Sequence, residues 1–107
     1  MNATITAELQ KAHTARATGN EGQARVCARR AAGWAIRAWY QRQLGPEWSG
    51  DAMKQLHKLH ADAAFPEMVR NAALRLTTKV NHVQQLPFTE DVLVDAEPII
   101  TFIAKAE

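Results

Sequence analysis

The chain has 107 residues, of which 47% are hydrophobic and 22% are charged, with one cysteine and a net charge of +2. A chain of this length fits a single domain with its own core, taken here as residues 1–107. One cysteine excludes an internal disulfide, a zinc ribbon and a CxxC redox site. No apolar run approaches the ~20 residues of a membrane span, and the N-terminus lacks the apolar segment of a secretion signal. We therefore expect a cytoplasmic protein that does not contact a membrane.

Two helices are predicted in the N-terminal half of the chain. The first covers about residues 3–18 and ends at Gly19, because glycine suits the left-handed position that follows a helix. Asn20 then caps a long second helix over residues 21–44, since its side chain can accept a hydrogen bond from the first turn.

Three more helices are predicted after a glycine- and proline-containing break. A short helix covers residues 51–63, and Pro66 begins a fourth helix over residues 66–84. Thr89 caps the last helix, in which Pro98 marks a kink or a restart. Because short connections place neighbouring helices antiparallel, the expected fold is all-α, an up-and-down bundle of four main helices plus one short helix.

The second helix contains the stretch QARVCARRAAGWAIRAWYQRQ, which has five arginines and no acid. At 100° per residue, its small and aromatic residues form two arcs, so we expect a central helix that is buried on more than one side. The wider arc contains Cys27, Ala28, Ala31, Trp34, Ala35, Ala38 and Trp39. The arginines fall between the two arcs and do not form one basic stripe.

These arginines allow two interpretations. Residues 1–46 hold seven basic and two acidic side chains, whereas residues 89–107 hold one basic and five acidic side chains. We therefore expect the arginines to pair with carboxylates of the last helix or of a partner copy. The alternative is a nucleic-acid or nucleotide-binding surface formed by clustered cations. Its residues would be Arg25, Arg29, Arg30 and Arg37.

The order of the helical segments carries a resemblance to a known family. GNEGQARVCARRAAGWAIRAWY is followed by LHKLH, then by FPEMVRNAALRLTTKVNHV, and then by DVLVDAEPIITFIAKAE. In this order of segments and in its high content of alanine and arginine, nearly the whole chain resembles small prokaryotic HEPN-domain proteins. The resemblance implies an up-and-down helical bundle, a homodimer, and a role in toxin–antitoxin or other defence systems.

Active members of that family are metal-independent RNases with an arginine, a polar residue and a later histidine in their motif. RLTTKVNH offers Arg75 and His82, two turns apart on one predicted helix, as a cation and an imidazole that would act together. Leu76 replaces the family's Asn or Asp, and the earlier pair Arg70–Asn71 is followed by arginine where histidine belongs. We therefore expect a non-catalytic HEPN-like interaction module, associated with RNA, a nucleotide or a protein partner. The alternative is an RNase with a composite site at the dimer interface.

Other residues that could bind a metal, act as a nucleophile or contact a partner have simpler interpretations. His57 and His60 are too few to hold a metal, so we expect no metal and no cofactor. Cys27 is expected to pack as a small core residue. Val94 and Phe102 lie off the main apolar stripe of the last helix and predict a second hydrophobic patch, which favours a homodimer.

Overall fold

The computed structural model describes residues 2–78, 88 and 90–106, and within them it forms helices and no strand. This confirms the predicted all-α bundle, with the third helix the shortest. In chain order the helices are α1 (Ala3–Ala17), α2 (Glu21–Leu44), α3 (Ala52–His60), α4 (Glu67–Thr77) and α5 (Val92–Ala106).

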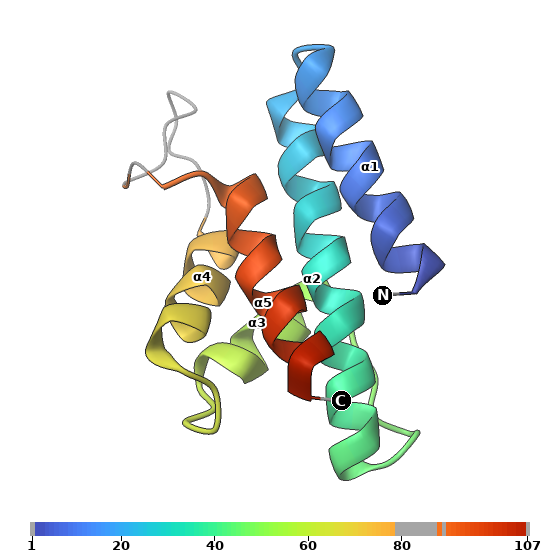
Figure 1. The fold of residues 1–107 in the computed structure, drawn as a ribbon, viewed down its shortest axis with the longest axis vertical. Coiled ribbons are helices and arrows are strands. Elements are labelled where there is room, and N and C mark those ends of the chain that lie inside the picture. The colour runs from blue at the N-terminus through green and yellow to red at the C-terminus, as the bar shows by residue number, and fades with distance from the viewer. Residues whose placement is uncertain (1, 79–87, 89, 107) are drawn as a thin grey trace.

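The first two helices form an antiparallel hairpin (Figure 1). The Asn2 side chain accepts a hydrogen bond from the Ile5 N–H at 2.9 Å, and this caps α1. Gly19 has a φ of 86°, a left-handed conformation that glycine adopts without steric cost. Asn20 then caps α2 by accepting from the Gln23 N–H at 3.0 Å. The predicted break at Gly19 and cap at Asn20 are both confirmed.

Helix α2 is the central helix, because it contacts each of the other four described helices. Figure 1 shows α5 running beside α2, with α4 on the far side of α5. Small side chains let these helices approach closely, as predicted from the alanine-rich arc. The fully buried alanines of α2 are Ala24, Ala28, Ala31 and Ala32. Cys27 is buried among them, which confirms its predicted role in the core.

Two helices end earlier than predicted. Helix α3 ends at His60 instead of residue 63, because the Asp62 carboxylate accepts from the Ala64 N–H at 2.9 Å and turns the chain. Helix α4 ends at Thr77 instead of residue 84, since Thr78 is extended. The hydroxyls of Thr77 and Thr78 both donate to the Leu74 carbonyl, in competition with the helical backbone bonds.

The start of α5 also differs in detail from the prediction. Thr89 lies outside the described residues, and the Asp91 carboxylate accepts from the Leu93 N–H at 3.0 Å beside the first turn. The helix then continues through Pro98 without a restart. Phe102 packs on Phe65 with ring centres 5.4 Å apart, so it belongs to the core and does not join the exposed Val94 in a patch.

A hydrogen bond from Tyr40 to Asp62 joins α2 to the turn after α3. The Tyr40 hydroxyl donates to Oδ2 of Asp62 at 2.6 Å, and this bond is the main reason that the pKa of Asp62 lies below its ordinary value of 3.8. Tyr40→Phe is expected to lower the free energy of unfolding by about 1–2 kcal/mol at neutral pH.

The pH dependence of this effect follows from the direction of the shift. A lowered carboxyl pKa stabilises the fold above the ordinary value of 3.8, and that contribution is lost as pH falls through the folded-state pKa. Urea unfolding should therefore give a difference in the free energy of unfolding between wild type and Tyr40→Phe that is constant above pH 3.8 and shrinks as the pH falls below it. A difference that is the same in acid would contradict the assignment.

Candidate functional site

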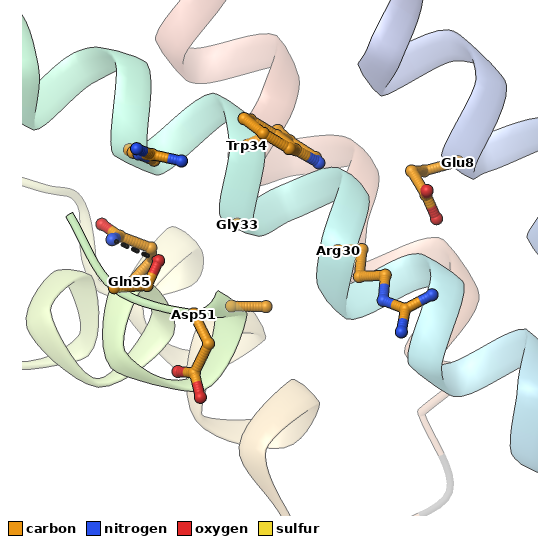
Figure 2. Close-up of a pocket in the computed structure, with 9 residues that line it drawn as sticks. Glu8, Arg30, Gly33, Trp34, Asp51 and Gln55 are labelled. Atoms are coloured by element: carbon orange, nitrogen blue, oxygen red, sulfur yellow. Dashed lines mark hydrogen bonds between the residues drawn. The ribbon is translucent and has the colours of Figure 1, made fainter.

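A pocket of about 370 Å³ lies where α2 meets the middle of α1 and the start of α3 (Figure 2). Its floor is Gly33 of α2, which touches the first residue of α3. A Cβ on Gly33 would lie 2.9 Å from both Cα and Cβ of Ala52, so a larger residue cannot occupy this position without moving one helix. The volume is within the range of ~300–1,000 Å³ that small-molecule sites occupy.

One wall of the pocket is a basic and aromatic face of α2. Arg30, Trp34 and Arg37 line it at helical spacing, and they therefore project from the same side of the helix. The Arg37 guanidinium carbon lies 5.5 Å from the centre of the Trp34 ring. Trp34 was predicted to fill the buried arc, but it is 42% exposed. Trp34 is exposed because α3 packs against α2 at Gly33, the residue before it, and does not cover the Trp34 ring, which lines the pocket.

The opposite wall contains an acid from α1. Glu8 is 9% exposed, and its Oε1 lies 3.6 Å from the ammonium of the exposed Lys11. Its Oε2 is buried and has no hydrogen-bond partner. Figure 2 shows the Glu8 carboxylate and the Arg30 guanidinium extending into the space beside the Trp34 ring. Asp51, which caps α3, brings a second carboxylate to the rim.

Arg37 also has a buried polar atom without a partner, and in this case the atom is a hydrogen-bond donor. Its Nε is buried and donates to no acceptor. Within the part of the chain that the structure describes, Glu8 Oε2 and Arg37 Nε are the two buried side-chain polar atoms without a partner, and both belong to residues of this pocket. Buried polar groups are normally paired, so a donor and an acceptor left open in one cavity point to a missing partner.

The four arginines predicted as a binding set are divided by the structure. Arg30 and Arg37 share the pocket, whereas Arg29 donates to the Leu76 carbonyl at 2.6 Å and to the Thr78 carbonyl at 3.4 Å. A cation at these terminal carbonyls of α4 also suits the helix dipole. Burial, followed by the nearby Arg25, lowers the pKa of Arg29. Arg29 therefore connects α2 to α4 and faces away from the pocket.

The predicted pairing of these arginines with the acidic last segment is wrong for four of the five. Among the described residues, no carboxylate forms an ion pair with Arg25, Arg29, Arg30 or Arg37. Nearly all of the buried residues of α2 are small or aliphatic, and none of them is an arginine, so the arginines project from other parts of the helix. The two ends of the chain still meet, because Arg16 of α1 bonds Asp91 at 2.7 and 2.9 Å.

Arg75 is engaged by the last helix. Its Nε and one terminal nitrogen donate to the two oxygens of Asp95 at 2.9 and 2.8 Å, and Glu90 lies 3.7 Å from the other nitrogen. These carboxylates raise the pKa of the guanidinium. His82 lies outside the described residues. Because α4 ends at Thr77, the helix predicted to carry both Arg75 and His82 ends between them.

The histidines of α3 also have structural surroundings. His60 is half-buried, and its Nδ1 lies 3.2 Å from the Arg70 carbonyl, so it bridges α3 to α4. His57 is exposed.

Sequence reasoning missed Glu8, although a signal for it was present. Glu8 falls at helical spacing between Ile5 and Ala12, in the stripe that packs α1 against the rest of the bundle. A lone acid within an apolar stripe is a residue that needs a partner. Recognising it as part of a pocket required knowing which face of α2 lies opposite.

Comparison of the chain with protein-family models, with curated proteins and with solved structures finds no match. None of the helices in the described ranges has both the length and the apolar character needed to cross a bilayer.

Proposed function

We propose that this chain is a non-catalytic, HEPN-like helical module that binds a nucleotide unit, either free or within RNA, in the pocket between α1, α2 and α3. The observation that carries the proposal is the α2 face on which Trp34 lies between Arg30 and Arg37 at the pocket. Neither arginine has a carboxylate partner among the described residues, so both guanidinium groups are free to meet an anion.

The chemistry of this face suits a nucleotide. Guanidinium groups donate to phosphate oxygens through charge-assisted hydrogen bonds. An exposed indole offers a flat surface on which a base can stack, and such stacking contributes about 1–3 kcal/mol per base. Arg37 already lies over the Trp34 ring, so one residue can contact both the ring and a phosphate beside it.

The engagement of Arg75 by Asp95 favours the non-catalytic form of the module over the RNase alternative. The Arg75 guanidinium donates two hydrogen bonds to the Asp95 carboxylate, and these bonds join α4 to α5. Arg75 therefore has a structural role and is not available to an RNA substrate. Pairing of two copies, as the family resemblance implies, stays a prediction that sizing of the purified protein would test. A role in a toxin–antitoxin or other defence system stays a prediction of the same resemblance.

The experiment is a titration of the protein with a short single-stranded RNA. The double substitution Arg30→Ala/Arg37→Ala is expected to lower affinity at least tenfold, since each charged hydrogen bond contributes about 1.5–3 kcal/mol. With two phosphate contacts, wild-type affinity should fall roughly sevenfold from about 50 to about 200 mM salt, and the double variant should lose most of that dependence.

Arg25→Ala is the matched control, because Arg25 lies on the same helix, forms no ion pair with another described residue and is not part of the pocket. It is expected to leave affinity within about twofold of wild type. If wild type binds no RNA, or if Arg25→Ala weakens binding as much as the double variant, the proposal is wrong.

A further inference from the structure

We infer that the pocket selects guanine among the bases, with Glu8 of α1 as the residue that determines specificity. The inference rests on the proposed nucleotide function and goes beyond it, because it names the base. It starts from the Glu8 carboxylate, which is 9% exposed and has one oxygen without any partner.

The charges of the pocket show that a phosphate alone is an incomplete ligand. Arg30 and Arg37 bring two positive charges, and Glu8 and Asp51 bring two negative charges. Asp51 already accepts from the Lys54 N–H at 2.9 Å as the cap of α3. Among the described residues, the one ion pair of Glu8 is with the exposed Lys11, at 3.6 Å. A matching ligand is therefore anionic where it meets the arginines and rich in hydrogen-bond donors where it meets Glu8.

Guanine meets this requirement better than the other bases. An ionised carboxylate only accepts hydrogen bonds. The Watson–Crick edge of guanine presents two adjacent donors, N1–H and the N2 amino group, to the two oxygens of one carboxylate. Adenine and cytosine each place a ring nitrogen acceptor beside their amino group, and uracil has one N–H between two carbonyls. Each of these would direct an acceptor at a carboxylate oxygen.

The positions of the side chains allow all three contacts at once. In Figure 2, the Glu8 carboxylate lies to one side of the Trp34 ring, and the Arg30 guanidinium lies lower in the view than both. A base stacked on the indole can turn its donor edge toward α1 while its phosphate meets the α2 arginines. Both unpaired atoms, Nε of Arg37 and Oε2 of Glu8, are buried in this structure. The two side chains therefore have to turn toward the ligand for the first to gain an acceptor and the second a donor.

The test is a calorimetric titration of the full chain with GMP, IMP, AMP, CMP and UMP. Wild type is expected to bind GMP about tenfold more tightly than AMP, because one carboxylate bond is gained and one repulsive contact is avoided. IMP keeps N1–H but lacks the amino group, so its affinity should fall between those of GMP and AMP. This comparison needs no substitution, and so it does not depend on any variant folding.

Glu8→Gln keeps the shape of the side chain and removes its charge, so it should reduce the preference for GMP over AMP to less than threefold. GMP should bind more weakly than to wild type, and AMP should bind no more weakly, because the repulsion between the carboxylate and the adenine acceptor is gone. Equal binding of GMP and AMP by wild type, together with a loss of both in Arg30→Ala/Arg37→Ala, overturns guanine selection and leaves the proposed function standing. A Glu8→Gln variant that weakens all five nucleotides equally also overturns it. If wild type binds neither nucleotides nor RNA, both proposals fall.

Discussion

Arg75→Met lowers the free energy of unfolding by about 3 kcal/mol, because it leaves the Asp95 carboxylate buried without a partner. Asp95 has a side-chain exposure of 7%, and both of its oxygens accept from Arg75. This loss of stability is at the lower end of the range expected for breaking a buried ion pair, because 23% of the Arg75 side chain is exposed and Arg75 also has a longer contact with Glu90. Urea unfolding followed by circular dichroism measures it.

Two controls separate loss of the pair from loss of an arginine. Arg25→Met removes a half-buried arginine that forms no ion pair within the described ranges, and it should change the free energy of unfolding by less than about 1 kcal/mol. Adding Asp95→Asn to Arg75→Met removes the unpaired charge, so the double variant should be more stable than Arg75→Met alone. An Arg75→Met protein as stable as wild type, with reduced RNA cleavage, would contradict the structural role and favour the RNase alternative.

Gly33→Leu is expected to cost about 3 kcal/mol, because overpacking a tight contact forces the helices apart. A side chain at this position meets the backbone of Ala52 at 2.9 Å, and backbone cannot move aside as a flexible side chain can. Gly33→Ala should cost about 1 kcal/mol, since the gain of ~1 kcal/mol in helix propensity offsets part of the clash. Because the start of α3 lines the pocket, its displacement in both variants should also weaken nucleotide binding.

Gly22→Ala is the matched control for this prediction. Gly22 lies in the first turn of the same helix, and a Cβ there would meet its nearest neighbours at 3.9 Å, an ordinary contact. This variant should be as stable as wild type or more stable by up to ~1 kcal/mol, with unchanged nucleotide affinity. The close approach of α2 and α3 would be refuted if Gly33→Ala and Gly22→Ala had the same effect.

Local signals predicted most of the fold. Asn20 and Gly19 define the α1–α2 connection through a cap and a left-handed residue, both of which act within a few positions along the chain. The end of α4 was less predictable, because helix propensity alone extends it across Thr77 and Thr78. Their hydroxyl bonds to the Leu74 carbonyl compete with the helix, and whether they prevail depends on the surroundings.

The pocket was predictable only in part. Arg30 and Arg37 are seven residues apart, a spacing that brings two side chains to one face of a helix, and both line the pocket. The separation of Arg29 from them depends on where α4 ends, which involves residues 47 and 49 positions away. Glu8 comes from another helix, and it faces this edge because of the way α1 packs along α2, which local signals in the sequence do not specify.

The most direct test of the nucleotide site uses the indole N–H signals of the three tryptophans in a ¹H–¹⁵N NMR titration with GMP and AMP. The Trp34 indole and the Gly33 amide should shift most. The Trp39 indole should stay in place, because its ring packs on Phe65 with ring centres 5.5 Å apart and does not line the pocket. Saturating nucleotide that leaves Trp34 unmoved, or that shifts the residues around Arg75 instead, would show that the pocket between α1, α2 and α3 is not the binding site.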